Sequence, residues 1–475
     1  MNERAAALPP GEPTEPTEPR EPRVVRAAAM PAGTPEVAAL VVGAGACGLT
    51  AAIFLREAGV DCLLLERDES LRGSTALSSG FIPAAGTRVQ RAAGVFDDSP
   101  ARFAEEIQVK AQGRAAPHLV AAYAEAAGAA LDALQERHGL AFELLDGFLY
   151  PGHGVRRMHT LPERSGAALM GALETAARRA GAEILTRALA RELWCDEGDR
   201  VLGVGLERPD GRLEHVACGA LLLACNGFGG HAALVRELLP AMREAVFAGH
   251  AGNDGSAILW GRALGAALAD LGACQGHGSW ALPHGVLITW ALMMQGGIQV
   301  NARGERFHDE TAGYSEASLE VLAQPGGIAW NVLDARLVAL GRTFPDFRAA
   351  EEAGALRHAA DVKALAALIG CDADALAATL STTRLEPPYA AIKVTGALFH
   401  TQGGLDIDAQ CRVLHARDAS PFPNLFAAGG AARGVSGNRL EGYLSGNGLL
   451  SAVAGGFIAA HTMARQLTAK EATAP

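Results

Sequence analysis

A glycine-rich turn between two apolar runs constrains the fold more than any other feature of the sequence. Residues 37–42 form a β-branched apolar run, and the turn 43–48 (Gly-Ala-Gly-Ala-Cys-Gly) leads into a segment of helical composition at 49–58. A second apolar run, 62–65, closes on Glu66. The glycines let the backbone approach a pyrophosphate, the helix N-terminus offers N–H groups, and the acid accepts a ribose hydroxyl. This order predicts a dinucleotide-binding βαβ unit.

The loop after Glu66 distinguishes a flavin from a nicotinamide dinucleotide. Residues 72–80 read Arg-Gly-Ser-Thr-Ala-Leu-Ser-Ser-Gly. Such a small, hydroxyl-rich loop can wrap a ribityl chain and lets a flavin ring lie against the backbone, whereas a nicotinamide enzyme has no need of it here. The segment therefore favours FAD, with an ordinary surface loop as the alternative.

Composition limits the number of domains, the partners and the compartment. A chain of 475 residues exceeds what one hydrophobic core usually supports, so we expect two domains. The net charge of −11 leaves no basic footprint for nucleic acid or an anionic membrane. The eight cysteines lack CxxC spacing, which gives no support for a disulfide scaffold, a metal site or a c-type haem and fits a reducing cytoplasm. No apolar stretch reaches the roughly 20 residues that span a bilayer, so we expect no membrane span.

Later glycine turns extend the pattern of the N-terminal unit. Each follows an apolar run or opens a segment of helical composition, as a dinucleotide site requires. They lie at residues 225–230, 252–255, 424–430 and 446–453. Because two of them are near the C-terminus, the dinucleotide-binding domain is predicted to be discontinuous in sequence.

The turns also set the predicted domain boundaries. We predict an α/β fold in which a discontinuous Rossmann-like FAD-binding domain, residues 37–268 and 386–468, carries an inserted α+β cap domain at 269–385. Residues 1–36, which include the low-complexity run PTEPTEPREPR, are predicted to be a disordered tail. Residues 469–475 form a second predicted tail.

Nine segments, in this order, resemble the fumarate reductase and 3-ketosteroid dehydrogenase group of flavoproteins. They are GAGACGLTAA, LLERD, GSTALSSGF, LLACNGFGG, AGNDGSA, GGIQVNARGERFHDE, HTQGGLDID, NLFAAGG and GYLSGNGLLSA. The resemblance spans roughly residues 37–465. It implies a two-dinucleotide-binding-type FAD domain with an inserted mobile cap, and an active site between the two.

The resemblance and the glycine turns together predict the cofactor-binding residues. These are Gly43, Gly45, Ala46, Cys47, Gly48, Glu66, Arg67, Ser74, Thr75, Ser79, Gly80, Asn226, Gly227, Asn253, Asp254, Gly429, Gly430, Gly448, Leu449 and Leu450. Family members that bind FAD covalently attach it through a histidine in the loop that here reads GSTALSSG. Because this loop contains no histidine, we expect noncovalent FAD.

Two kinds of active site occur in the resembled group. Hydride transfer between flavin N5 and a substrate carbon needs one group that stabilises charge on a carbonyl or carboxylate and another that gives or takes a proton. In the fumarate reductases an arginine in a GxRFxxE segment donates the proton, and histidines with another arginine hold the dicarboxylate. In the ketosteroid dehydrogenases a tyrosine eight residues after that arginine is the base, and a second tyrosine near the last helix polarises the ketone.

This sequence carries parts of both sets. Arg306, in GERFHDE, matches the proton-donor arginine, and Tyr314, eight residues later, matches the base. His400 matches a substrate histidine of the reductases, and His277 lies about where their other substrate histidine falls. With an insertion or deletion, the nearby His284 takes that place instead. Tyr443 lies where the reductases, counted without gaps, have their carboxylate-binding arginine. Each of these residues also has a plain packing role as its alternative.

The remaining candidates are less specific. Arg439 lies four residues before Tyr443 and supplies the missing guanidinium if the loop contains an insertion. Trp280 begins an apolar segment, 280–294, that forms either cap core or the lining of a hydrophobic pocket. His153 and His159 are expected to make surface or FAD-domain contacts.

A tyrosine with its ordinary pKa of about 10 is a poor base, so a neighbouring cation has to lower that pKa. We expect Arg306 to be that cation for Tyr314. With Tyr443 in place of an arginine, one carboxylate of a dicarboxylate would lose its bidentate partner.

These residues predict an FAD-dependent oxidoreductase that acts on CH–CH groups. The leading hypothesis is α,β-dehydrogenation of a cyclic ketone or 3-oxosteroid-like substrate, or the reverse enone reduction. The alternative is reduction or dehydrogenation of an unsaturated mono- or dicarboxylic acid with Arg306 as proton donor. A third reading is an FAD-binding structural or redox-sensing module without turnover. No haem motif or iron–sulfur cysteine set is apparent, so a separate electron partner such as a quinone or a small carrier is expected.

Overall fold

The N-terminal glycine turn lies at one edge of a large, mostly parallel sheet. In the computed structural model, which describes residues 21–471, nine strands form this sheet in the order β1-β8-β9-β10-β2-β3-β7, and β21 joins β10 and carries β20. The strands are β1 Arg23–Arg26, β2 Glu36–Val42, β3 Cys62–Leu65, β7 Glu183–Leu185, β8 Leu189–Cys195, β9 Val201–Glu207, β10 Leu213–Leu223, β20 Arg412–Leu414 and β21 Pro421–Ala427. Strands β2, β3, β7, β10 and β21 run parallel, as their unbroken apolar sequences favour.

Nine helices of the described residues accompany this sheet, and α1 follows β2 directly after the glycine turn. They are α1 Ala46–Glu57, α2 Gly73–Ala76, α3 Arg88–Ala92, α4 Pro100–Lys110, α5 Pro117–His138, α6 Gly166–Arg179, α7 Ala232–Leu238, α8 Ser256–Leu264 and α15 Asn447–Glu471. A Cβ atom on Gly48 would lie 1.9 Å from the carbonyl oxygen of Gly43, so only glycine allows the turn to fold this tightly onto α1. Two small sheets, β4-β6-β5 and β12-β19, complete this domain. Their strands are β4 Ile82–Pro83, β5 Glu143–Leu144, β6 Met158–Thr160, β12 Leu268–Ala269 and β19 Gly404–Leu405.

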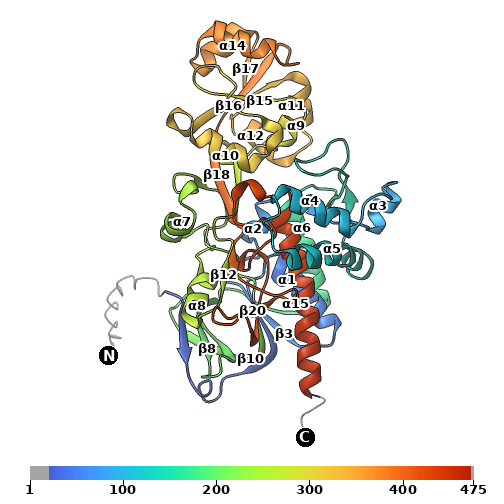
Figure 1. Ribbon diagram of the computed structural model, residues 1–475, viewed down its shortest axis with the longest axis vertical. Helices are drawn as coiled ribbons and strands as arrows, with labels where there is room; N and C mark the ends of the chain where they lie inside the picture. The colour runs from blue at the N-terminus through green and yellow to red at the C-terminus, as the bar shows by residue number, and fades with distance from the viewer. Residues whose placement is uncertain (1–20, 472–475) are drawn as a thin grey trace, which may run out of the picture.

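A second sheet forms the upper domain in Figure 1. Its order is β14-β13-β18-β16-β15, and β11 and β17 also pair with β18. The strands are β11 Val246–Phe247, β13 Cys274–Ala281, β14 Val286–Leu287, β15 Ile298–Val300, β16 Ile328–Asp334, β17 Arg357–Ala359 and β18 Tyr389–Thr401. Its helices are α9 Ala291–Met294, α10 Tyr314–Leu322, α11 Ala335–Gly341, α12 Pro345–Glu352, α13 Val362–Ile369 and α14 Ala373–Ser381. Most of its elements fall within residues 269–385, the range predicted for a cap, and we call it the cap.

The structure differs from the predicted boundaries at four places. Strand β11, inside the predicted FAD-binding range 37–268, pairs with β18 of the cap sheet. The boundary at residue 386 assigned β18 to the FAD-binding domain, but β18 is the central strand of the cap sheet. Residues 23–26, predicted to be part of a tail, form β1 and pair with β8. Helix α15 continues to Glu471, past the predicted end at 468. A long, almost fully buried strand such as β18 fits either sheet by sequence alone, because apolar content does not identify the neighbouring strand. Residues 1–20 and 472–475 lie outside the described part.

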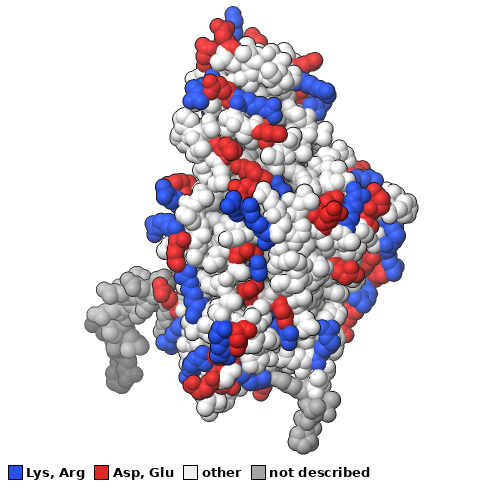
Figure 2. All heavy atoms as spheres, viewed as in Figure 1, with Lys and Arg blue, Asp and Glu red and all other residues white. Residues whose placement is uncertain are grey.

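Charged side chains are spread over both domains. On the face drawn in Figure 2, Lys and Arg alternate with Asp and Glu, and neither sign forms a large patch. Among residues 21–471, no helix combines the length and the apolar character that a membrane span requires.

Candidate active site

A deep cavity lies between the two domains. The FAD-binding domain supplies the β2–α1 turn, the end of β3, the loop 73–80 and the start of α15. The cap supplies side chains from β13, β18 and the segment 287–290, together with Tyr314 at the first position of α10. Because the carboxyl ends of parallel strands meet here, the site lies where open α/β sheets generally bind ligands.

Glu66 closes the cofactor end of this cavity. Its side chain follows β3 and is buried; Oε2 accepts from the N–H of Ala44 at 3.1 Å and Oε1 from that of Asp68 at 3.0 Å. Burial raises the pKa of Glu66, and the two backbone N–H groups act against this rise. The carboxylate thus braces the glycine turn while facing the cavity.

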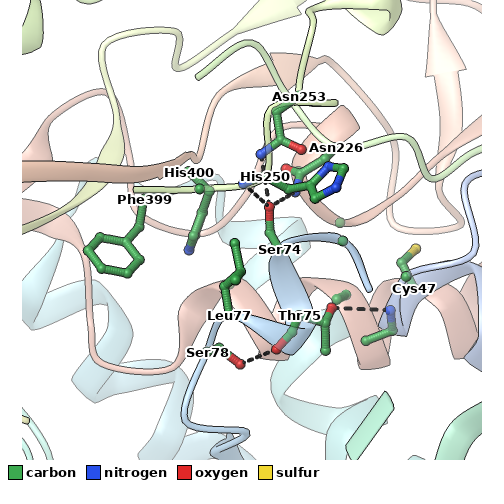
Figure 3. A pocket seen from close by; sticks show the side chains of 18 of the residues that line it. Cys47, Ser74, Thr75, Leu77, Ser78, Asn226, His250, Asn253, Phe399 and His400 are labelled. Carbon is green, nitrogen blue, oxygen red and sulfur yellow. Dashed lines mark hydrogen bonds between the residues drawn. The ribbon is translucent and has the colours of Figure 1, made fainter. Parts of the chain in front are cut away.

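Ser74 joins three loops around the same cavity, as Figure 3 shows. Its Oγ accepts from Nδ2 of Asn253 at 2.9 Å, from Nδ2 of Asn226 at 3.1 Å and from the N–H of His250 at 3.4 Å. Nearby, Arg67 donates to Asp254 at 3.0 Å and to the Gly252 carbonyl at 3.1 Å. The hydroxyl-rich loop is therefore held in place by side-chain amides from the glycine turns that follow β10 and β11.

Two tyrosines meet at the other end of the cavity. The Tyr443 hydroxyl accepts from the N–H of Gly448 at 3.3 Å and donates to Oε1 of Gln275 at 3.2 Å. The Tyr314 ring stacks on His277 with 5.0 Å between ring centroids and meets the edge of Tyr443 at 6.0 Å. The base predicted on the cap and the donor predicted before the last helix therefore face each other.

Burial sets the ionisation of this end. It raises the pKa of Tyr314 well above its ordinary value and that of Tyr443 to about 12. It lowers the pKa of His277 to about 3 and that of His400 to about 4. At neutral pH both tyrosines are protonated and both histidines are neutral.

His400 lies beside the first turn of α15. Its Nδ1 is 3.2 Å from Nε2 of Gln402 and 3.3 Å from the carbonyl oxygen of Thr401. A Cβ atom on Gly448 would lie 2.6 Å from Nε2 of His400, so glycine is required there. Figure 3 shows the imidazole reaching into the cavity beside Phe399.

Neither candidate arginine of the substrate end lines the cavity. Arg306 lies on the cap, 40% exposed, and Nε donates to Oε2 of Glu310 at 2.9 Å. The other oxygen of Glu310 accepts from the N–H of Gln299 at 2.7 Å, so Arg306 fastens its own segment to β15. Arg439 is exposed. The prediction that Arg306 lowers the pKa of Tyr314 is wrong, because its guanidinium is paired with Glu310 and burial raises that pKa.

Other predicted residues are also displaced from the cavity wall. Trp280 does not line the cavity but packs edge-on against Phe399 at 5.7 Å, while Trp290 does line it. All of the predicted cofactor residues line the cavity except Gly48, Gly227 and Leu450. Gly48 closes the turn from inside, Gly227 packs on Thr401, and Leu450 is buried in the core.

Two histidines and a serine complete the description of the site. His153 Nε2 is 2.9 Å from the Ser445 carbonyl oxygen, and His159 Nε2 is 2.7 Å from Oγ1 of Thr87. Both histidines are buried contacts of the FAD-binding domain. Ser445 lines the cavity two residues after Tyr443 and was not predicted. The sequence did indicate it, because Ser445 places a hydroxyl in the same turn as Tyr443.

Sequence comparison assigns this arrangement to a family. The family model described as FAD binding domain matches residues 38–449. The chain belongs to this family. The predicted family, its fold class and its assignment to the FAD-dependent oxidoreductases are confirmed.

Known members of the family include enzymes with both kinds of substrate. The chain is 28% identical over 450 residues to an NADH:fumarate oxidoreductase of Klebsiella pneumoniae, with 90% of this chain and 47% of that protein covered. The chain thus spans about half the length of that relative. It is 25% identical over 556 residues to the 4-oxocyclohexanecarboxylate 2-dehydrogenase of Sinomonas cyclohexanicum, with 91% and 94% covered.

Solved structures give the same two classes. A flavocytochrome c3 fumarate reductase in an open conformation superposes with a TM-score of 0.78 at 25% identity, covering 92% of this chain and 79% of that one. The 3-ketosteroid-Δ4-(5α)-dehydrogenase of Rhodococcus jostii RHA1, in complex with 4-androstene-3,17-dione, has a TM-score of 0.74 at 25% identity, covering 92% and 99%.

The residues present fit the FAD of the family. The N-termini of α1 and α15 open on the cavity, where a pyrophosphate and a flavin ring need hydrogen-bond donors. A Cβ atom at Gly45 would meet nothing nearer than Oγ1 of Thr75 at 3.8 Å, so this part of the turn is open toward the cavity. The Gly43–Gly48 turn, Glu66 and the loop 73–80 would hold the cofactor.

Glu66→Ala should weaken FAD binding by about ten- to a hundredfold, because it removes an acceptor for a ribose hydroxyl and two braces of the glycine turn. The dissociation constant is measured by fluorescence titration of FAD into apoprotein. Glu69→Ala is the matched control, since Glu69 is exposed and, among residues 21–471, forms its one ion pair with Arg187. An unchanged dissociation constant in Glu66→Ala would remove Glu66 from the cofactor site.

Proposed function

We propose that the protein dehydrogenates an uncharged cyclic ketone between its α and β carbons, or reduces the corresponding enone. The observation that carries this proposal is the charge of the cavity. Of the described residues that line it, Arg67 is the one arginine or lysine, and it is paired with Asp254 at the cofactor end. The substrate end carries two protonated tyrosines and two neutral histidines instead.

A dicarboxylate is a poor fit to this end. Two carboxylates that leave water require cationic, preferably bidentate, partners, and an unpaired buried charge is expensive. Arg306 and Arg439, which the carboxylate hypothesis needs, both lie away from the cavity. A ketone needs only hydrogen-bond donors to its oxygen, and the tyrosines supply them.

The apolar walls of the substrate end favour a substrate with a hydrocarbon ring. Tyr150, Leu287, Trp290 and Phe399 line the substrate end with aromatic and aliphatic surface. Such walls with a few convergent polar groups are typical of sites for small apolar molecules. A cyclic ketone would bury its carbon skeleton here and direct its oxygen toward Tyr443.

The proposed roles follow from these positions. When bound, FAD supplies the hydride acceptor or donor. Tyr443 donates a hydrogen bond to the ketone oxygen, because its hydroxyl proton can turn from Gln275 to the substrate. In enone reduction the Tyr314 hydroxyl donates its proton to the α carbon, and in dehydrogenation the deprotonated Tyr314 oxygen accepts the proton that the α carbon loses. The stacked His277 ring fixes the orientation of Tyr314. His400, which is neutral, is a second donor from Nε2 in the tautomer whose Nδ1 accepts from Nε2 of Gln402.

The cofactor linkage and the electron partner belong to the same proposal. We infer noncovalent FAD, because the loop 73–80 offers no histidine for attachment. We also infer that a separate quinone or small carrier exchanges electrons with the protein. The cytoplasmic location stays a prediction.

Anaerobic visible spectroscopy tests the proposed function. The purified holoprotein is mixed with saturated cyclic ketones, 3-oxosteroids and dicarboxylates, and the photoreduced protein is offered enones, fumarate and urocanate. Bleaching of the flavin band by a ketone, or reoxidation by an enone, is the expected result. Reoxidation of the reduced flavin by unsaturated acids alone would refute the proposal and support the carboxylate hypothesis instead.

Arg306→Gln separates the two substrate classes. On the ketone hypothesis its turnover should stay within about threefold of wild type, because Arg306 is 40% exposed, lies outside the cavity and holds only the cap segment. The variant leaves the buried Glu310 carboxylate without this partner, so the loss should appear as a lower melting temperature. Arg303→Gln, which removes a neighbouring exposed arginine paired with Glu305, is the control. A loss of about a hundredfold or more in Arg306→Gln alone would make Arg306 the proton donor.

A further inference from the structure

One ion pair links the FAD-binding domain to the helix that carries Tyr314. Lys110 is the last residue of α4, and its ammonium donates to the carboxylate of Glu316 in the first turn of α10. The same Nζ donates to the carbonyl oxygen of Ala312 at 2.9 Å. In Figure 1, α10 lies at the base of the upper domain, beside α4. Within residues 21–471, no other ion pair involves α10.

The pair is largely shielded from water. The side chains of Lys110 and Glu316 are 14% and 19% exposed. The stem of Lys110 lies close to Gly152, next to Leu444. Glu316 faces Lys110 and the more distant Glu441; burial raises its pKa, and Lys110 acts against this rise. Without Lys110, the carboxylate would face only a like charge.

The type of cation suits two acceptors at once. The sequence contains only four lysines, Lys110, Lys363, Lys393 and Lys470, and otherwise uses arginine. An ammonium has three donors around a compact charge and reaches a carbonyl and a carboxylate from one point, whereas a guanidinium presents a planar fork. Lys110 thereby binds the chain at Ala312 and at Glu316, one residue on each side of Tyr314.

Helix α10 is rigidly attached to the cap sheet. Ser315 Oγ donates to the Gly276 carbonyl of β13 at 3.2 Å. A Cβ atom on Gly278 would lie 2.8 Å from the carbonyl carbon of Ala317, so helix and strand are in close contact. A contact that holds the first turn of α10 therefore also holds Tyr314 and the cap sheet in place.

We propose that Lys110 and Glu316 are positioning residues that hold the start of α10 on the FAD-binding domain and thereby set Tyr314 opposite Tyr443. This role rests on the proposed function, because it concerns the proton carried by Tyr314. Neither residue lines the cavity, so both act through the placement of Tyr314. Breaking the contact leaves the ring present but lets it move away from the substrate carbon, which lowers kcat more than it raises KM.

The test compares Lys110→Met, Glu316→Gln and the double variant with two matched controls in the FAD-loaded protein. Lys363→Met and Glu320→Gln remove the same charges at exposed positions, the second on α10 itself. Hydrogen–deuterium exchange is followed in peptides covering 310–322 and, for reference, 362–381. We expect exchange of 310–322 to rise about tenfold in Lys110→Met and less in Glu316→Gln, with the reference peptides and both controls unchanged.

Kinetics with the best ketone complete the test. We expect kcat to fall about tenfold in Lys110→Met with KM within about threefold, and the double variant to lose no more than Lys110→Met, since one contact is removed once. Unchanged exchange, or an unchanged kcat with only a lower melting temperature, would overturn the positioning role. A wild-type protein that acts on no ketone would instead refute the proposed function, while the exchange result would still decide whether Lys110 holds α10.

Discussion

Tyr314→Phe should lower kcat for the best ketone by about a thousandfold, because it removes the hydroxyl that carries the proton and nothing else. The phenylalanine ring can keep the stacking on His277 and the edge contact with Tyr443. The fold, the FAD content and the melting temperature should therefore stay close to wild type. Stopped-flow bleaching of the flavin by the ketone measures the loss.

The raised pKa of Tyr314 predicts the pH dependence. A proton donor has to be protonated, and Tyr314 is protonated throughout the neutral range, so enone reduction should not vary with the ionisation of this group. Dehydrogenation needs the deprotonated form or a step that removes its proton. Its rate should therefore rise with pH across the accessible range without reaching a plateau. Tyr314→Phe should abolish this rise.

Tyr389→Phe is the matched control for Tyr314→Phe. Tyr389 begins β18 in the cap, is buried, and does not line the cavity, so removing its hydroxyl should leave kcat and its pH profile unchanged. Activity of Tyr314→Phe within about tenfold of wild type would exclude Tyr314 as the proton carrier. The substrate class would then have to be decided by spectroscopy alone.

The dinucleotide unit was predictable because its signal is local. Strand, glycine turn, helix, strand and Glu66 follow one another within 30 residues, 37–66, and each step has its own physical reason. The same holds for the later glycine turns at 225–230 and 446–453, which open on the same cavity. The family comparison agrees with this part of the prediction.

The direction of side chains was not predictable in this way. Arg306 matches a family motif by spacing, yet it pairs with Glu310, four residues on, and lies outside the cavity. A motif fixes the place of Arg306 in the sequence, whereas the direction of its side chain depends on the contact with Glu310 that forms on folding. The membership of β18 in the cap sheet also depends on pairing with β13 and β16, distant in sequence.

Contacts between the two domains could not be predicted from the sequence, because they also join residues that are distant along the chain. Lys110 and Glu316 are 206 residues apart, and neither is part of a motif. The environment of Tyr314 also arises only after folding, because its pKa is set by burial between the cap and the FAD-binding domain. Tyr314 and Tyr443 were predicted, but the protonated state of Tyr314 required the structure.

Tyr443→Phe should lower kcat by about a hundredfold, because the ketone oxygen loses one preorganised donor as negative charge develops on it. Burial raises the pKa of Tyr443 to about 12, so its hydroxyl stays a donor at every pH at which the protein is assayed. The loss should therefore be the same at each pH, unlike the loss in Tyr314→Phe. Rates of flavin bleaching across a pH series measure this difference.

Gln275→Leu serves to separate donation from packing at Tyr443. Gln275 accepts the hydroxyl proton of Tyr443 in the absence of substrate, so removing it frees that proton for the ketone and should leave kcat within about threefold of wild type. If Gln275→Leu and Tyr443→Phe lose activity equally, the hydroxyl acts by joining Gln275 of β13 to Gly448 in the first turn of α15. If Tyr443→Phe retains full activity, the ketone oxygen takes its hydrogen bond from another donor, and His400 beside Gly448 is the nearest candidate.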